Sequence, residues 1–149
     1  MTDSAQASAD QVIQLERDAL DRWGKGDPGG FLEVYAPDIT YFDPLTARRI
    51  DGHQGMVDYY RPWAGKISVA RYEMLNPQVV VDGDMGLLTY NLVNYVQSPD
   101  GVESMGSCWN STTVYQRRGA IWKTIHSHWS FTAHTAFQNL SPEASERQG

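Results

Sequence analysis

The chain has 149 residues, of which 41% are hydrophobic, and its formal net charge is -6 at pH 7. This length and composition predict one soluble globular domain with a sizeable core. The acidic balance argues against a general nucleic-acid-binding protein, because phosphate contacts need clustered Lys and Arg. The single cysteine, Cys108, excludes an intramolecular disulfide and a cysteine-based metal site.

The N-terminal region carries no sign of a targeting segment. Residues 1–10 are small and acidic and contain neither the basic nor the apolar part of a signal peptide. No apolar run in the chain approaches the length of a membrane span. We therefore expect a cytoplasmic protein that binds neither membranes nor nucleic acids.

Two helices are predicted in the first third of the chain. Residues 1–7 are expected to be a flexible lead-in, after which Ser8 and Gln11 have the spacing of a capping box. Apolar residues then recur at helical spacing and predict an amphipathic helix: Val12, Leu15, Ala19, Leu20 and Trp23. After a glycine-rich turn, Asp27 and Pro28 predict the start of a short second helix.

Most of the remaining chain has β-type patterns. A short strand is predicted over residues 39–42, and a third helix over residues 53–63. Four long strands follow, joined by turn sequences: residues 69–81, 85–97, 102–116 and 120–131. The pair Asn76-Pro77 interrupts the first of these and indicates an edge strand or a bulge.

This order of elements is typical of an α+β fold in which helices cover one face of an antiparallel sheet. We expect a single domain over residues 8–138 and a polar C-terminal tail over residues 139–149. In the strand 85–97 neither face carries charged side chains, although the helices can cover only one face. The uncovered face therefore predicts a homodimer or a larger homo-oligomer.

The last predicted strand has two unlike faces, because successive side chains of a strand point to opposite sides. One face is expected to carry Trp122, Thr124, His126 and His128. The other is expected to carry Ile121, Ile125, Trp129 and Phe131. Histidine is the side chain most easily tuned to exchange protons near neutral pH. The face with the histidines is therefore a candidate wall of a pocket.

His126 and His128 admit several interpretations. They can be strand histidines that are hydrogen-bonded to neighbouring polar groups. They can also donate a proton to a developing oxyanion or orient Asp43. Metal binding is a further hypothesis, since His-x-His plus one carboxylate can form a facial triad. The sequence indicates no third ligand, so we expect neither a metal nor a cofactor.

Asp43 ends a strand that carries Tyr41 and Phe42, and it precedes Pro44. One interpretation is a turn residue, because an Asp side chain readily hydrogen-bonds the backbone of a following loop. The other is a carboxylate at the mouth of a pocket, desolvated by aromatic rings, that acts as a general base.

Mixed aromatic and small polar side chains predict the walls of a ligand pocket. They lie on two neighbouring strands: Asn91, Tyr95, Trp109, Ser111 and Thr113. Pockets combine apolar walls with a few placed polar groups, whereas ordinary packing with cross-strand hydroxyl pairs is the alternative. Tyr41 and Tyr60 are expected to complete the walls around a small apolar, aromatic or carbonyl ligand.

The order of motifs resembles a known superfamily. Two segments carry the resemblance: Tyr35-Ala36-Pro37-Asp38-Ile39-Thr40-Tyr41-Phe42-Asp43-Pro44 and the ending Gly119-x-x-Trp122-Lys123-x-Ile125-His126-x-His128. Over residues 10–135 the chain resembles the nuclear transport factor two-like, or cystatin-like, superfamily. Within it, the chain is similar to SnoaL-like proteins and to the association domain of calcium/calmodulin-dependent kinase. The resemblance implies a cone-shaped, cystatin-like barrel, in which a curved antiparallel sheet wraps around N-terminal helices and dimerises through its convex face.

The resemblance also implies roles for individual positions. Ketosteroid isomerases of this superfamily use an aspartate that matches Asp43 as the proton-shuttling base. Their oxyanion donors match Ala19 and Thr113, which argues against steroid isomerisation by the same arrangement. The arginines that hold a carboxylate in the kinase association domain match Asn91 and Thr113, which argues against an anionic ligand.

Two functions follow as hypotheses. The first is a cofactor-independent isomerase, cyclase or lyase that moves a proton next to a carbonyl, with Asp43 as base and His126 or His128 polarising the carbonyl. The second is a non-catalytic ligand-binding or oligomerisation module of the association-domain type.

Overall fold

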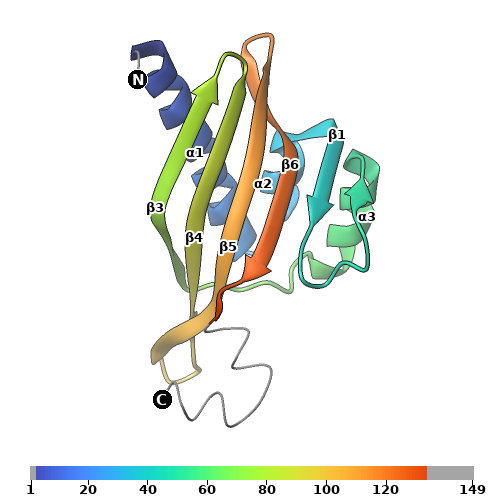
Figure 1. Cartoon of the computed structure of the whole chain (residues 1–149). Helices are drawn as coiled ribbons and strands as arrows, with labels where there is room; N and C mark the ends of the chain where they lie inside the picture. Colours follow the sequence, from blue (N-terminus) through green and yellow to red (C-terminus); the bar gives the residue numbers. More distant parts are fainter. Residues whose placement is uncertain (1–2, 134–149) are drawn as a thin grey trace.

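A layer of helices packs against a curved sheet, and the computed structural model describes residues 3–133 of the chain (Figure 1). The first helix, α1, spans Asp3–Gly24. Val12, Ala19 and Leu20 are at most 4% exposed, as the helical spacing predicts. The expected lead-in is helical from Asp3 onward, so Ser8 lies inside α1 instead of capping its start. The expected C-terminal tail lies outside the described residues.

The segment between α1 and the long strands contains two helices and two short strands. They are α2 (Gly29–Val34), β1 (Tyr35–Phe42), β2 (Ile50–Asp51) and α3 (His53–Tyr60). A 3-10 turn, Arg61–Trp63, follows α3, where Pro62 lacks the backbone donor that a longer α-helix needs. The sequence does not predict β2, because two residues are too few to show an alternating pattern.

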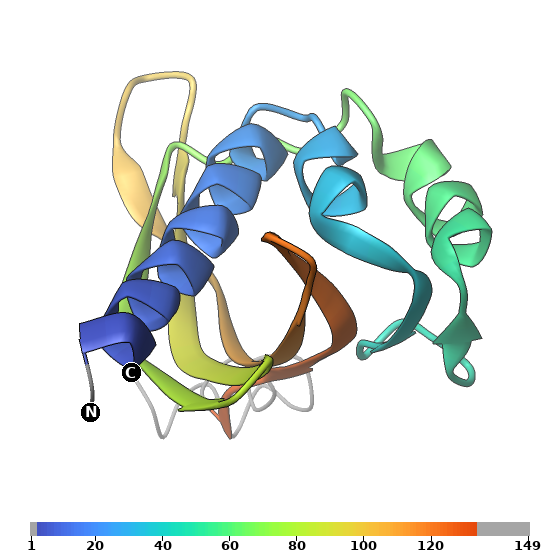
Figure 2. The same ribbon diagram turned by 90° about the horizontal axis from the view of Figure 1, so that it is seen from above.

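Six strands form one curved, open sheet (Figures 1 and 2). The long strands are β3 (Arg71–Asp82), β4 (Met85–Gln97), β5 (Glu103–Arg118) and β6 (Ile121–Phe131). These four strands pair with one another as antiparallel neighbours, and the order across the whole sheet is β2-β1-β6-β5-β4-β3. The predicted α+β class is confirmed. However, β1 pairs with β6 in parallel, and the sheet stays open instead of closing as a barrel.

β3 lies at an edge of the sheet, and its register with β4 shifts between Leu75 and Gln78. Asn76 lies within this bulge and has a φ of 50°, a left-handed conformation that asparagine tolerates better than most residues. The edge strand and the bulge predicted from Asn76-Pro77 are both confirmed.

A bulge in β6 changes which side chains face the helices. The register against β5 shifts so that Ile125 is an extra residue in β6. The extra residue reverses the alternation, and the buried side chains of this strand are Trp122, Thr124, Ser127 and Trp129. His126 and His128 therefore lie on the opposite side of β6 from Trp129. This corrects the division of the strand into faces that simple alternation predicts.

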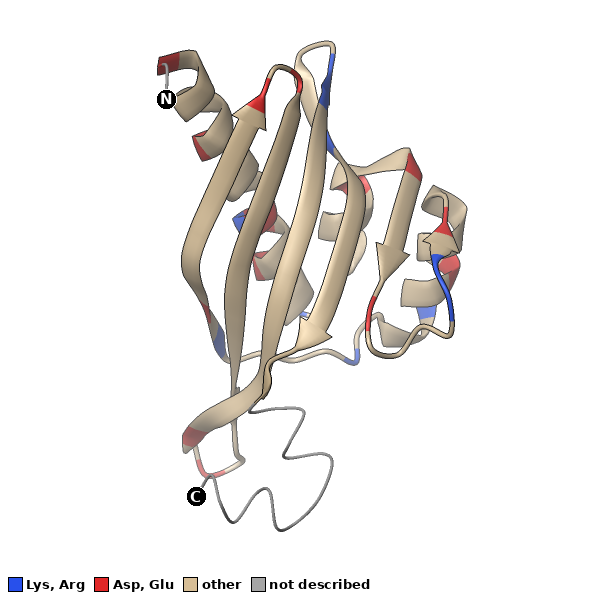
Figure 3. Ribbon diagram, in the orientation of Figure 1, with Lys and Arg blue, Asp and Glu red and all other residues tan. Residues whose placement is uncertain are grey.

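The described helices cover only the concave face of the sheet (Figure 2). On that face Leu88, Tyr90 and Leu92 of β4 are at most 5% exposed. On the convex face Leu87 is 40% exposed. Charged residues lie mainly at the strand ends and on the helices, and the middle of the described sheet has none (Figure 3). Within residues 3–133, no helix has the length and apolarity needed to cross a membrane.

Candidate functional site

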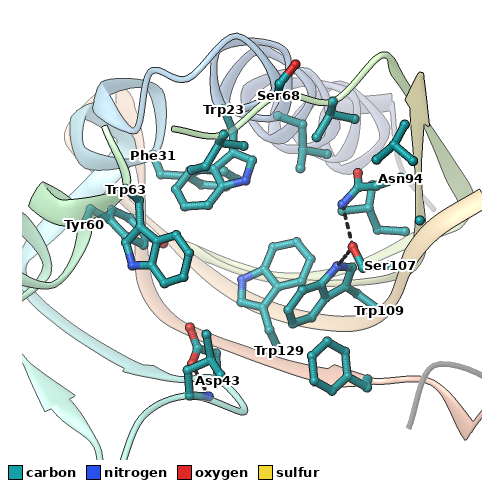
Figure 4. Close-up of a pocket in the computed structure, with 18 of the residues that line it drawn as sticks. Trp23, Phe31, Asp43, Tyr60, Trp63, Ser68, Asn94, Ser107, Trp109 and Trp129 are labelled. Carbon is teal, nitrogen blue, oxygen red and sulfur yellow. Dashed lines mark hydrogen bonds between the residues drawn. The ribbon is translucent and has the colours of Figure 1, made fainter. Parts of the chain in front are cut away.

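A cavity of about 630 Å³ lies between the helical layer and the concave face of the sheet (Figure 4). Helices α1, α2 and α3, the 3-10 turn and the end of β1 border it on one side. The inner faces of β4, β5 and β6 border it on the other. A concave, mostly apolar space of this size suits a small organic ligand.

Four of the chain's five tryptophans line this cavity, and each comes from a different element. They are Trp23, Trp63, Trp109 and Trp129. Trp109 stands nearly perpendicular to Trp129, with the ring centroids 6.0 Å apart. Trp23 contacts Tyr60 edge-on at 5.0 Å. Rings held by such contacts form rigid apolar walls.

Asp43 is the only Asp, Glu, Lys, Arg or His among the described residues that line the cavity. Tyr59 Oη lies 2.8 Å from Oδ1 and 2.7 Å from Oδ2 of its carboxylate. Tyr41 Oη donates to Oδ2 at 2.9 Å. The backbone N–H of Leu45 donates to Oδ1 at 2.8 Å, which is the hydrogen bond of a turn aspartate. Asp43 is therefore both a turn residue and a firmly oriented carboxylate at the cavity.

The phenols around Asp43 remain protonated. Burial, followed by the neighbouring Tyr60 and Tyr35, raises the pKa of Tyr41 well above its ordinary value. Burial, and then the hydrogen bond to Asp43, raises the pKa of Tyr59. Burial also raises the pKa of Tyr60, whose hydroxyl lies 2.9 Å from that of Tyr35. These hydroxyls are hydrogen-bond donors in the neutral pH range and cannot act as bases there.

A second polar group lies on the β4–β5 wall of the cavity (Figure 4). Trp109 Nε1 donates to Ser107 Oγ at 2.8 Å. Asn94 Nδ2 donates to the same oxygen at 3.2 Å. All three residues line the cavity, and Ser107 and Asn94 lie apart from Asp43 across the space between the rings.

The predicted site residues divide between the cavity and other places. Tyr41, Asp43, Tyr60 and Trp109 line the cavity. Ser111 and Thr113 lie on the same strand as Trp109 but are enclosed in the core, 3% and 1% exposed, and do not border it.

Asn91 and Tyr95 lie on the convex side of β4, away from the cavity. Asn91 Nδ2 donates to Asn110 Oδ1 of the neighbouring strand at 2.7 Å. The Arg71 guanidinium lies 3.8 Å from the centroid of the Tyr95 ring. The cavity instead receives the alternate residues of β4, such as Asn94, because the strand register decides which set faces inward.

His126 and His128 lie outside the cavity. His126 Nδ1 lies 2.7 Å from Thr40 Oγ1, and both imidazoles pack on Phe42. Burial, followed by the neighbouring His128, lowers the pKa of His126, so its imidazole is mostly neutral at pH 7. Within residues 3–133, no group of three or more His, Cys, Asp or Glu is arranged to hold a metal ion. His126 is therefore a strand histidine that is hydrogen-bonded to a polar neighbour, which is one of its interpretations from the sequence.

Sequence reasoning misses several cavity residues for different reasons. Tyr59 reaches Asp43 only because α3 lies beside β1, a contact that no local pattern records. Ser107 lies on the strand face that alternation assigns to Trp109, Ser111 and Thr113, although it is not among the proposed wall residues. Trp129 falls on the face that alternation assigns away from the pocket, because the bulge at Ile125 has no signature in the sequence.

The chain is similar to one protein family and to solved structures of one fold. The model of the SnoaL-like domain family matches residues 12–134. The comparison with curated proteins finds no match.

Three solved structures show the range of similarity. A candidate ketosteroid isomerase from Parabacteroides distasonis is 32% identical, with 82% of this chain and 86% of that chain covered and a TM-score of 0.71. An NTF2-like protein of unknown function from Pseudomonas putida is 26% identical; the match covers 84% of this chain and 87% of that chain, and the TM-score is 0.70. The association domain of C. elegans CaMKII is 19% identical, with 87% and 99% covered and a TM-score of 0.73. Identity as low as the last value shows a shared fold alone.

Proposed function

The chain belongs to the SnoaL-like family, and we propose that it binds a small organic ligand and moves a proton next to a carbonyl group of that ligand, with Asp43 as the base. One observation carries the proposal: a carboxylate held by two phenols lies at the edge of an aromatic cavity. The similarity to a candidate ketosteroid isomerase supports this class of chemistry.

The composition of the cavity favours an uncharged, apolar ligand. Its described lining consists mainly of aromatic and aliphatic side chains. It offers no Lys, Arg or His among residues 3–133, so an anionic ligand would meet only the negative charge of Asp43. A neutral ring compound with a carbonyl group fits both properties.

In the proposed reaction, Asp43 removes a proton from the carbon beside the carbonyl. The electron pair of the broken C–H bond forms an enolate, and negative charge moves onto the carbonyl oxygen. Return of the proton to another carbon completes an isomerisation, whereas expulsion of a leaving group completes a lyase reaction. Tyr41 and Tyr59 position the carboxylate for this transfer. Proton transfer of this kind requires no cofactor.

The Asp43→Asn variant tests the base, because it keeps the shape of the side chain and removes its basicity. The readout is the exchange of the protons beside the carbonyl of 2-tetralone for deuterium in D2O, followed by NMR. We expect the enzyme-dependent exchange rate to fall by about 10²–10⁴-fold. Asp82→Asn, at an exposed strand end, is the matched control and should leave the rate unchanged. An unchanged rate in Asp43→Asn would contradict the proposal.

The alternative is a non-catalytic ligand-binding or oligomerisation module. Two observations favour it: the TM-score of 0.73 with the CaMKII association domain, and the convex face that the described helices leave uncovered. A homo-oligomer is expected under both proposals. Light scattering after size-exclusion chromatography, run beside the exchange assay, separates them. A ring of many copies without exchange supports the module, and a dimer with exchange supports the enzyme.

A further inference from the structure

We propose that Ser107, backed by Asn94 and Trp109, donates a hydrogen bond to the carbonyl oxygen of the ligand. The inference rests on the proposed carbonyl ligand and adds the group that polarises it. His126 and His128 do not border the cavity, and the tyrosines near Asp43 already donate to its carboxylate. The charge that develops on the carbonyl oxygen therefore needs a stabilising donor other than these residues.

The hydrogen-bond inventory of Ser107 leaves its proton available. A serine hydroxyl has two acceptor lone pairs and one O–H donor. Trp109 Nε1 can only donate, and it occupies one lone pair at 2.8 Å. Asn94 Nδ2 occupies the other at 3.2 Å. The O–H of Ser107 has no acceptor among the described residues, and the side chain borders the cavity.

The three residues Ser107, Asn94 and Trp109 still offer a hydrogen-bond donor to a ligand if the Asn94 amide is rotated by 180°. Ser107 would then donate to the Asn94 carbonyl oxygen, and the amide N–H2 would lose its only partner among the described residues. Because Trp109 cannot accept a hydrogen bond, neither arrangement satisfies every donor of the three residues. An acceptor supplied by the ligand completes the group in both arrangements; it accepts from Ser107 in the arrangement described and from the Asn94 amide in the rotated one.

A bulge in β5 places Ser107 in this position. The register between β4 and β5 shifts so that Gly106 and Ser107 together face Asn94. At Gly106 an added Cβ would lie 3.1 Å from the backbone oxygen of Asn94 and 3.2 Å from Val96 Cγ1. The close approach of the two strands thus favours a glycine at this position. Bulges commonly re-aim a side chain next to a functional site.

The surroundings strengthen the proposed donor. Two incoming hydrogen bonds polarise the Ser107 hydroxyl, and hydrogen bonds in chains reinforce one another. The rings of Trp109 and Trp129 border the same space and give it apolar walls. A fixed donor in such a site stabilises an oxyanion more than it does in water. The substrate class that fits this proposal is a ring ketone whose oxygen accepts from Ser107 and whose acidic C–H bond faces Asp43.

Two matched probes test the donor without knowledge of the natural ligand. 2-Acetylnaphthalene carries a carbonyl group, and 2-ethylnaphthalene has nearly the same shape without it. Binding is measured by quenching of tryptophan fluorescence. In Ser107→Ala we expect the affinity for the ketone to fall about three- to tenfold, the size of one neutral hydrogen bond. The affinity for the hydrocarbon should stay within about twofold, since its binding uses only the apolar walls.

Infrared spectroscopy gives a readout that a purely structural role would not change. The C=O stretch of bound 2-acetylnaphthalene should move to higher wavenumber in Ser107→Ala, because the carbonyl loses its donor. Ser107→Thr keeps the hydroxyl and should keep both the ketone affinity and the lower wavenumber. Ser104→Ala, an exposed position on the same strand that does not border the cavity, is the control.

The outcomes separate this inference from the proposed function. Equal losses for ketone and hydrocarbon in Ser107→Ala would overturn the inference and assign Ser107 a packing role. A ketone affinity and C=O stretch that do not change would overturn it as well. A selective loss of ketone affinity, together with unchanged deuterium exchange in Asp43→Asn, would support the donor and reject Asp43 as the base.

Discussion

Glu16 of α1 is a carboxyl group in the core of the molecule, only 1% exposed. Its two oxygens accept hydrogen bonds from Tyr90 Oη and Tyr115 Oη, each at 2.6 Å. Burial raises the pKa of Glu16, and the hydrogen bonds from Tyr115 and Tyr90 offset only part of that effect. The folded protein therefore keeps a proton on Glu16 at pH values where the unfolded chain has released it.

This shift makes the free energy of unfolding depend on pH. Below the unfolded pKa of about 4.5, Glu16 is protonated in both states, so its burial does not lower the free energy of unfolding through ionisation. As the pH rises from there through the folded pKa, the folded state binds more protons than the unfolded state, so stability falls. Glu16→Gln removes this titration. We expect its stability relative to the wild type to increase between pH 5 and pH 8, measured by urea unfolding.

Glu16→Leu is the matched comparison for this prediction. It leaves the hydroxyls of Tyr90 and Tyr115 without an acceptor in the core, which should destabilise the protein by about 2–4 kcal/mol relative to Glu16→Gln at both pH values. A difference between Glu16→Gln and the wild type that stays constant with pH would show that Glu16 does not titrate as described.

At the scale of elements, the bulge in β5 connects local packing to the cavity. Gly106→Ala would bring a Cβ within 3.1 Å of the Asn94 backbone oxygen, and a strand backbone moves less easily than the end of a side chain. We expect this variant to lose about 1–3 kcal/mol of stability, the usual cost of overpacking. Urea unfolding measures the change.

Gly86→Ala in β4 provides the control for this element. There an added Cβ would have its nearest contact at 3.7 Å, with the ring of Trp122, which is ordinary van der Waals distance. Since alanine restricts the unfolded chain, this variant should be neutral or gain up to about 1 kcal/mol. Equal losses in Gly106→Ala and Gly86→Ala would mean that the bulge does not require glycine.

At the scale of the whole molecule, the sheet has one face covered by helices and one convex face that they leave bare. The convex face carries exposed apolar side chains such as Val80 and Leu87, which are 56% and 40% exposed. The middle of the described sheet contains no charged residue (Figure 3). A surface of this kind is typical of an association site. We expect the wild-type protein to be a homo-oligomer in solution.

Leu87→Asp tests this assembly, because a charge in the middle of an apolar interface is costly to bury. We expect the oligomer to dissociate at least about tenfold more readily, the effect of roughly 1.4 kcal/mol, with the fold retained. Light scattering and circular dichroism measure the two properties. Val102→Asp, 60% exposed near a hairpin tip, is the control and should assemble normally. A monomeric wild type would contradict the prediction.

Much of the fold was predictable from local patterns. The strand predicted over residues 85–97 coincides with β4, and the helix predicted from His53 begins there. The resemblance to SnoaL-like proteins is confirmed by the family match over residues 12–134. At the site, Asp43 and Trp109, which the patterns proposed as site residues, line the cavity. They did not locate Tyr59, which contacts Asp43 from a different element.

The sequence by itself determined the α+β class, the order of the elements and a carboxylate beside aromatic residues at a strand end. These properties depend on neighbours in the chain, through helical spacing, strand alternation and turn residues. Only the tertiary structure decided that Trp129, and not His126 or His128, faces the cavity, and that Ser107 meets Asn94 there. Strand register and bulges arise from contacts between distant segments, and one extra residue such as Ile125 reverses every face that follows it.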